Sequence, residues 1–205
     1  MTEPTSWTDL VPRMQTGDLI LFAGTSSAAR IIETATGGPY SHTSMIFRPD
    51  AATAPQLWEE VSFVTGKDKI THDDHNGAQL GDALELVNEY IKQGDVPWYR
   101  PLVWDRPKHF NTTVLEIMKS LDDTPWGTSV EMVGDFIEGR VFNHDSGTAH
   151  MVCSALVAST YQHVGLLNDD HPPNYYSPSS FAPGHHDLVL QLGAELGAAI
   201  EIDVS

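Results

Sequence analysis

The hydrophobic pattern of the chain changes over short distances and predicts strands and helices of modest length. Residues 17–22 begin with a Gly-Asp pair and continue as an apolar run. Residues 40–47 alternate polar and apolar side chains, and Pro49 ends this pattern. Both patterns are typical of strands. Residues 56–64 are the predicted hairpin partner of 40–47, and residues 98–103 are a further predicted strand.

Four other segments have the 3.6-residue period of amphipathic helices. They are residues 27–36, 83–93, 111–121 and 153–164. The expected capping residues of the first three are Thr25 or Ser26, Asp82 with Glu85, and Asn111. Gly37 and Gly165 are the expected stops of the first and the last. The expected inward side chains are Ala83, Leu84, Val87, Ile91, Val114, Leu115, Met118, Leu156, Val157, Tyr161 and Val164.

The remaining segments are predicted to be irregular or short. Residues 67–77 form a polar loop, residues 131–137 a short helix, and residues 168–184, rich in Pro, Asn and Ser, an irregular stretch. Further loops are expected at 122–128 and 143–147. Residues 188–202 are ambiguous between helix and strand. Because strands and helices follow one another in mixed order, the predicted fold class is α+β.

Composition restricts the class of protein without naming an activity. The 205 residues include 28 acidic and 11 basic side chains, which give a formal net charge of −17, and 40% are hydrophobic. Such an acidic surface repels nucleic-acid phosphates and anionic membranes, so neither is expected as the main partner. The length suits one domain with a sizeable core. No segment has the pattern of a membrane span or a signal peptide, and we expect a cytoplasmic protein.

Cys153 is the only cysteine of the sequence, which excludes an internal disulfide and a zinc site built from cysteines. It stands in the first turn of a predicted helix, where the macrodipole and free backbone N–H groups favour the nucleophilic thiolate. Ser154 and the small Ala155 leave space around the sulfur. An inert, buried cysteine is the alternative interpretation.

A cysteine hydrolase also needs an imidazole that moves the proton and a group that orients this imidazole. Of the ten histidines, His42 is the best placed, because a strand fixes its direction and its neighbours are small or hydroxylated. The predicted neighbouring strand carries Glu59 and Glu60. Successive strand residues point to opposite faces, so only one of the two acids can share a face with His42. The pattern alone leaves open which one does.

Several short motifs occur in the order found in a known family. They are Gly17-Asp18-Leu-Ile-Leu-Phe22, Tyr40-Ser41-His42, Leu57-Trp58-Glu59 and Val152-Cys153-Ser154-Ala-Leu-Val157, with Gly77-Ala-Gln-Leu80, Arg100-Pro101-Leu102 and residues 176–181 as further matches. In this order they resemble the circularly permuted NlpC/P60 papain-like cysteine hydrolases of the YiiX/YaeF-like group, in which the His strand precedes the Cys helix. The resemblance covers residues 11–183. It implies one permuted domain over residues 1–205 with a variable tail at 184–205, built as an antiparallel sheet packed against helices.

The resemblance also implies a Cys-His-Glu triad. Cys153 is the expected nucleophile, His42 the base and then the acid, and Glu59 the orienting carboxylate, because the Trp-Glu pair of the family aligns on residues 58–59. The backbone N–H of Cys153 is the expected oxyanion donor. Tyr40 is expected to line the site. No cofactor and no metal ion are expected.

Two other uses of the histidines compete with this triad. His72-Asp-Asp-His75 and His185-His186-Asp187 contain residue types that bind metals, although solvated loops explain both clusters. His150, three residues before Cys153, is a second candidate partner of the thiolate. It ranks below His42, because the segment that enters the helix is expected to direct it away.

We therefore expect an amidase or peptidase that cleaves a small peptide-like or lipid-linked amide, or an ester, through a thioester on Cys153. Ala155 stands where many members of the family have an acidic residue, which leaves the substrate preference open. A lipid-directed acyl hydrolase or acyltransferase on the same Cys-His pair is the first alternative, and it would need an apolar patch for membrane contact. A non-catalytic binding module that keeps the fold is the second. The oligomeric state is left open.

Overall fold

The structure is a computed structural model that describes residues 3–61, 67–74, 76–122, 140 and 153–204. Its strands are β1 (Thr5–Ser6), β2 (Leu19–Ala23), β3 (His42–Phe47), β4 (Gln56–Val61), β5 (Gly77–Asp82), β6 (Val96–Arg100), β7 (Leu102–Val103), β8 (Glu195–Leu196) and β9 (Ile200–Asp203). Its helices are α1 (Trp7–Leu10), α2 (Ser27–Thr36), α3 (Ala83–Lys92), α4 (Phe110–Leu121) and α6 (Cys153–His163). Short 3₁₀ turns are η1 (Val11–Arg13), η2 (Pro173–Tyr175) and η3 (Pro178–Phe181).

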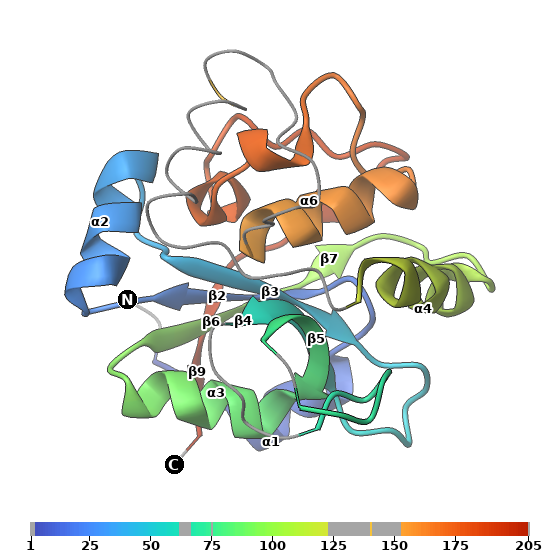
Figure 1. The fold of residues 1–205 in the computed structure, drawn as a ribbon, viewed down its shortest axis with the longest axis horizontal. Helices are drawn as coiled ribbons and strands as arrows, with labels where there is room; N and C mark the ends of the chain where they lie inside the picture. Colours follow the sequence, from blue (N-terminus) through green and yellow to red (C-terminus); the bar gives the residue numbers. More distant parts are fainter. Residues whose placement is uncertain (1–2, 62–66, 75, 123–139, 141–152, 205) are drawn as a thin grey trace.

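The main sheet has the strand order β1-β9-β6-β2-β3-β4-β5 and is antiparallel except for the β1–β9 pair. Strands β7 and β8 pair separately. Helix α6 covers one face of the main sheet, and α3 and α1 lie against the other (Figure 1). The architecture is therefore mixed α+β, with a mostly antiparallel sheet between helices.

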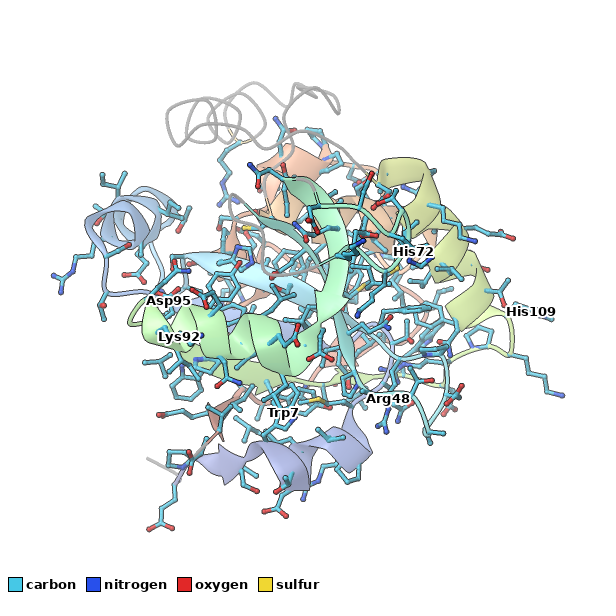
Figure 2. The ribbon with its side chains drawn as sticks, turned by 60° about the horizontal axis from the view of Figure 1, so that its bottom comes forward. Trp7, Arg48, His72, Lys92, Asp95 and His109 are labelled. Atoms are coloured by element: carbon cyan, nitrogen blue, oxygen red, sulfur yellow. The ribbon has the colours of Figure 1, made fainter. Side chains whose placement is uncertain are left out.

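Strand β2 shows how both faces of the sheet are buried. Leu19 and Leu21 belong to the core on the side of α6, whereas Ile20 and Phe22 belong to the core on the side of α3. All four side chains are fully buried, which explains why this strand is apolar without alternation. The α3 side is closed by Trp7, which lies between α1 and α3 (Figure 2).

The buried carboxylate of Asp18 connects β2 to the segments beside it. Its Oδ1 accepts hydrogen bonds from the Leu102 N–H at 2.9 Å and from Arg106 Nη2 at 2.6 Å. Its Oδ2 accepts from the Gln15 N–H at 2.8 Å and from the Tyr99 hydroxyl at 2.7 Å. Because each oxygen has two donors, this carboxylate is a fixed point of the fold.

Two predicted helices are confirmed together with their caps. The hydroxyl of Ser26 accepts from the Ala29 N–H at 3.0 Å, so Ser26 caps α2, and Gly37 ends it at φ 70°. Asp82 caps α3 by accepting from the N–H groups of Leu84 and Glu85. The strands predicted at 17–22, 40–47 and 56–64 are found as β2, β3 and β4, and the helix predicted from Cys153 is found as α6.

The inward sides of α3 and α4 differ from the predicted ones. In α3, Leu84 is exposed and Ile91 packs only in part against the core, whereas Leu86 and Tyr90 are buried. The buried residues Ala83, Leu86, Val87 and Tyr90 form the regular stripe of positions three and four residues apart. In α4, Ile117 is buried in the same way and Leu115 only in part. Helix α4 also starts one residue early, so that Asn111 lies inside it and donates to the Pro49 carbonyl at 2.8 Å instead of capping.

The predicted strands also need correction in three places. Residues 77–82 form β5, which has no apolar run because two of its six residues are glycines. The strand predicted at 98–103 is divided into β6 and β7 at Pro101, which cannot donate to a ladder. The ambiguous segment 188–202 contains β8 and β9. The elements predicted at 131–137 and 143–147 lie outside the described residues.

None of the helices that the structure describes has both the length and the apolar composition that crossing a bilayer requires.

We predict that Asp18→Ala lowers the free energy of unfolding by about 3–5 kcal/mol, because it leaves the Arg106 charge and three further donors without their buried acceptor. Chemical denaturation monitored by circular dichroism measures the change. Asp105→Ala, which removes an exposed carboxylate close to Arg106 in sequence, is the matched control and should cost less than about 0.5 kcal/mol. Equal losses in the two variants would contradict the role given to Asp18.

Candidate active site

The structure brings Cys153, His42 and Glu59 together, although they are distant in sequence. Cys153 is the first residue of α6, His42 the first residue of β3, and Glu59 lies within β4. His42 Nε2 is 3.0 Å from Glu59 Oε2, and the imidazole is also hydrogen-bonded to the thiol of Cys153. All three side chains are buried. The imidazole therefore connects the sulfur to the carboxylate.

These groups meet where the backbone pairing of β3 with β4 ends. Cross-strand pairs join the two strands from Met45, opposite Trp58, to Phe47, and in the described ladder they go no further toward His42. Strand β4 itself stays paired with β5 as far as Val61. The backbone N–H of Thr43 is instead hydrogen-bonded to the sulfur of Cys153. The thiol thus occupies a position that a neighbouring strand would otherwise take.

The imidazole of His42 lies on the α3 side of the sheet, opposite to the helix that carries the thiol. Its ring is 4.8 Å from the ring of Tyr90, in a stacked arrangement, and 5.5 Å from the ring of Phe22. Both aromatic residues belong to the core on the α3 side. Helix α6 packs on the other face of the sheet. Its thiol reaches this imidazole where the backbone pairing of β3 with β4 has ended.

Contacts at Nε2 determine which nitrogen of His42 can serve the thiol. Nε2 lies near Glu59 Oε2, the Ser44 hydroxyl at 3.2 Å and the Tyr90 hydroxyl at 2.9 Å. A carboxylate only accepts hydrogen bonds, so Nε2 carries a proton toward Glu59. Nδ1 is then the nitrogen that remains to exchange a proton with the sulfur of Cys153.

The charges of the cysteine and the histidine stabilise each other. Burial alone would raise the pKa of Cys153, but the His42 imidazolium and the N–H groups of Thr43 and Ser154 outweigh it and hold the pKa below its usual value of 9.0. Burial alone would lower the pKa of His42, but the Cys153 thiolate and Glu59 raise it to about 10. Each group therefore favours the charged form of the other, the thiolate of Cys153 and the imidazolium of His42.

Ser44 and Tyr90 complete the surroundings of Glu59, and neither was found from the sequence. The Ser44 hydroxyl donates a short hydrogen bond to Glu59 Oε2, and the Tyr90 hydroxyl donates to the same oxygen at 3.4 Å. Ser44 follows His42 by two positions and shares its strand face, a period that could have pointed to it. Tyr90 comes from a different element, α3, and no local pattern indicates its role.

Glu60 is fully buried on the opposite face of β4 from Glu59, and neither of its oxygens has a hydrogen-bond partner among the described residues. Thr43, on the α6 side of β3, has an equally buried hydroxyl without a partner there. Burial, together with the Cys153 thiolate, raises the pKa of Glu60 to about 10. Glu60 is thus a neutral carboxylic acid at neutral pH, and Glu59 is the acid that contacts His42.

No hydrogen bond or ion pair among the described residues joins the other candidate side chains to this cluster, and two of the candidates are not described. The Tyr40 side chain is buried, and burial raises its pKa against the influence of the nearby Arg100 cation. His150 and His75 lie outside the described residues. Of the second histidine cluster, His185 Nδ1 and Arg140 Nη1 both lie near Asp187 Oδ2, at 3.3 and 2.5 Å. Among the residues with described positions, no group of three or more His, Cys, Asp or Glu side chains is arranged to hold a metal ion.

Comparisons with known proteins add little to this geometry. No protein-family model and no curated protein sequence matches the chain. Among solved structures, it is similar to the metalloprotein yiiX from Escherichia coli O157:H7, with 19% sequence identity and a TM-score of 0.49. The alignment covers 72% of this chain and 64% of that one, so the chain spans just under two thirds of the length of yiiX. The chemistry of the site is consequently inferred from its own residues.

We predict that Glu60→Gln changes how stability depends on pH. In the unfolded chain Glu60 ionises near its ordinary pKa of 4.5, whereas in the folded protein it keeps its proton to about pH 10. Between these values the unfolded state binds fewer protons, so wild-type stability falls with rising pH through this group, by at most about 1.4 kcal/mol per pH unit. The free energy of unfolding of Glu60→Gln relative to wild type should therefore increase from pH 5 to pH 8 in urea titrations.

Glu116→Gln, at an exposed position of α4, is the matched control for this experiment and should differ from wild type by a constant amount. A constant difference for Glu60→Gln as well would show that Glu60 is ionised in the folded protein.

Proposed function

We propose that this protein is a cysteine hydrolase that cleaves an amide or ester bond through a thioester on Cys153. The observation that supports this most directly is the hydrogen-bonded series from the Cys153 thiol through His42 to Glu59. Each member has the chemical type that its position requires: a nucleophile, a proton carrier and an acceptor that orients the carrier. An inert cysteine needs none of these neighbours.

The proposed reaction follows from the protonation states of the pair. The Cys153 thiolate attacks the carbonyl carbon, and the tetrahedral intermediate collapses as the His42 imidazolium gives its proton to the leaving amine or alcohol. The neutral imidazole then takes a proton from water, whose oxygen attacks the thioester carbon. Collapse of the second intermediate expels the Cys153 thiolate and releases the acid product, while His42 keeps the proton taken from water, which restores the starting pair.

Glu59 has a positioning role in this proposal. Its Oε2 accepts from the Ser44 and Tyr90 hydroxyls and from His42 Nε2, so the carboxylate is held by three donors and holds the imidazole ring in turn. The negative charge favours the imidazolium form that donates to the leaving group. The backbone N–H of Cys153, at the start of α6, is the proposed donor to the oxyanion.

The order of the elements supports a permuted papain-like arrangement for a single domain. The strand with His42 comes first, the strand with Glu59 follows, and the helix with Cys153 comes late in the chain. The proposed substrate class is a small peptide-like or lipid-linked amide. Hydrolysis is favoured over a passive binding role, because the hydrogen-bonded imidazole of His42 lowers the pKa of the Cys153 thiol and can also donate a proton to a leaving group.

We predict that His42→Ala slows alkylation of Cys153 by iodoacetamide at pH 6.5 by at least about tenfold. Loss of the imidazolium raises the pKa of the thiol, and each unit costs a factor of about ten in thiolate at a pH below the pKa. The rate is measured by mass spectrometry across pH 5–10, and the midpoint of the variant should lie higher. His163→Ala, at the other end of α6, is the control and should behave like wild type. Equal rates for His42→Ala and wild type would refute the activated pair.

We further predict that brief exposure to a p-nitrophenyl ester leaves an acyl group on Cys153, detected by intact-mass and peptide mass spectrometry. Cys153→Ala should form no adduct and show no turnover. Glu59→Gln should still acylate, but with kcat/KM reduced by roughly 10²–10⁴-fold, because the imidazole loses its orienting charge. Glu116→Gln serves as the control substitution. Turnover by Cys153→Ala equal to wild type would contradict the proposal.

A further inference from the structure

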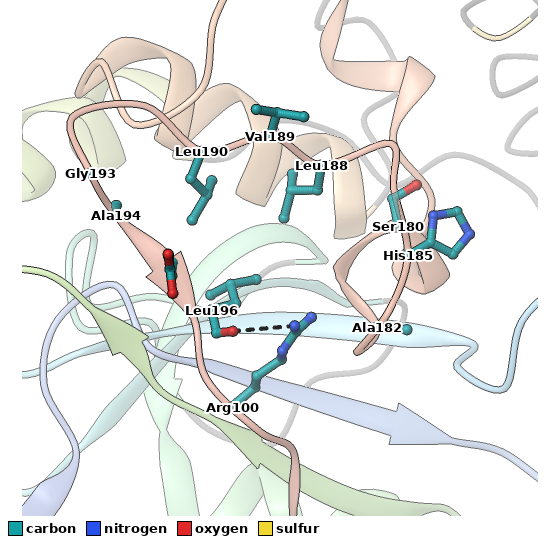
Figure 3. A pocket seen from close by; sticks show the side chains of 11 residues that line it. Arg100, Ser180, Ala182, His185, Leu188, Val189, Leu190, Gly193, Ala194 and Leu196 are labelled. Carbon is teal, nitrogen blue, oxygen red and sulfur yellow. Dashed lines mark hydrogen bonds between the residues drawn. The ribbon is translucent and has the colours of Figure 1, made fainter.

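A cavity lies at the C-terminal segment, and Cys153 is not among the residues that line it. Its volume is about 470 Å³, within the range of roughly 300–1,000 Å³ of small-molecule sites. Arg100 of β6 forms part of its wall, and residues between Ser180 and Leu196 form the rest (Figure 3). Cys153, His42 and Glu59 do not line it. The cavity therefore needs an explanation of its own.

The charge of Arg100 is the unusual feature of this cavity. Arg100 is only 8% exposed. Its Nε donates to the Gly197 carbonyl at 2.9 Å, Nη1 to the Phe181 carbonyl and Nη2 to the Leu196 carbonyl at 3.4 Å. Within the described parts of the chain, no carboxylate forms an ion pair with it. A buried cation held only by neutral carbonyls is rare, because burial without a counter-ion costs free energy.

Donor groups remain on the guanidinium for a ligand. A guanidinium has five N–H groups in a planar fork, and three of them are used by the carbonyls. The other two have no acceptor among the described residues. An anion at the wall of the cavity would supply both the missing counter-charge and the missing acceptors, and a carboxylate has the planar shape that fits this fork.

The opposite wall of the cavity is aliphatic. Leu188 and Leu190 lie across the space from Arg100 (Figure 3). The apolar surface continues outward, since Val189 is 62% exposed and Leu192, next to the lining residue Gly193, is 66% exposed. Leu192 also has φ 58°, a conformation that costs about 1–2 kcal/mol for a leucine.

We propose that this cavity binds an aliphatic carboxylate, whose oxygens accept hydrogen bonds from the two remaining N–H groups of Arg100 and whose chain lies against Leu188 and Leu190. At about 30 Å³ for each water-sized group, the volume accommodates roughly fifteen non-hydrogen atoms. A chain of medium length such as octanoate therefore fits, with room to spare.

The acidic surface does not prevent such binding. The formal net charge of −17 is spread over the molecule, and its effect on an anion is screened beyond about 10 Å at ordinary salt concentrations. The Arg100 charge acts at contact distance from within the protein, where screening is weak. Glu195, an exposed residue that lines the cavity, is the nearest opposing charge among the lining residues.

Isothermal titration calorimetry with octanoate tests the proposal on the full chain. We expect saturable binding of one octanoate per chain. We also expect 1-octanol, which has the chain without the charge, and acetate, which has the charge without the chain, to bind at least tenfold more weakly. The absence of saturable binding of octanoate at millimolar concentration would overturn the proposal, and so would equal affinity for octanoate and 1-octanol.

Matched variants locate the bound octanoate. Leu190→Asp places a carboxylate in the aliphatic wall and should weaken binding at least tenfold, whereas Ile31→Asp makes the same kind of change at an exposed position of α2 that does not line the cavity and should leave the affinity unchanged within a factor of two. Glu195→Gln, an exposed substitution with little risk to folding, should tighten binding by two- to fivefold. If Leu190→Asp does not fold, the Glu195→Gln result decides. Unchanged or weaker affinity of Glu195→Gln for octanoate would overturn the proposal.

Cys153→Ala separates this cavity from the proposed catalytic site. Because Cys153 does not line the cavity, the variant should bind octanoate like wild type, and octanoate should not slow alkylation of Cys153 in the wild-type protein. Loss of binding in Cys153→Ala would place the ligand at the catalytic site and overturn the proposal. Inactivity toward esters with octanoate binding intact would refute the hydrolase alone.

Discussion

The end of the backbone pairing between β3 and β4 is the constraint on which the candidate site depends. Both faces of the main sheet are covered, so a helix on one face and an acid on the other would ordinarily be divided by a layer of paired backbone. Where the pairing ends, the Thr43 N–H bonds to the sulfur of Cys153, and the His42 ring bridges to Glu59. The end of this pairing thus allows Cys153 to contact His42. It also leaves the Thr43 N–H to donate to the sulfur, which stabilises the thiolate.

This arrangement places several ionisable side chains, whose pKa values are shifted in different directions, close together. The site holds a thiol whose pKa is lowered, an imidazole whose pKa is raised, the carboxyl of Glu59 and, on the other face of β4, the neutral Glu60. Glu59 has three donors, whereas Glu60 has none among the described residues. The two adjacent acids thus differ in their surroundings, and burial without a hydrogen-bond donor among the described residues keeps the proton on Glu60.

The sequence predicted the local elements better than their assembly. The caps at Ser26 and Asp82 and the start of α6 at Cys153 follow from local chemistry and are found where expected. Strand alternation alone left Glu59 and Glu60 undecided, and the motif order of a resembling family favoured Glu59, the acid that contacts His42 in the structure. Tyr90 and the end of the β3–β4 ladder depend on tertiary packing, and the glycine-rich β5 lacks a periodic signal, so neither kind of feature can be predicted locally.

The position of β9 between β1 and β6 has a consequence for the order of folding. Residues 200–201 pair with residues 98–99, and residues 202–203 pair with residues 5–6, which are contacts of very large sequence separation. Such contacts close late, because the entropy of loop closure must be overcome first. During synthesis the outer edge of β6 therefore stays uncovered until residues 200–203 leave the ribosome. In this interval the unpaired N–H and C=O groups of β6 can pair with other chains, and a chaperone that binds strand edges would protect the chain at this edge.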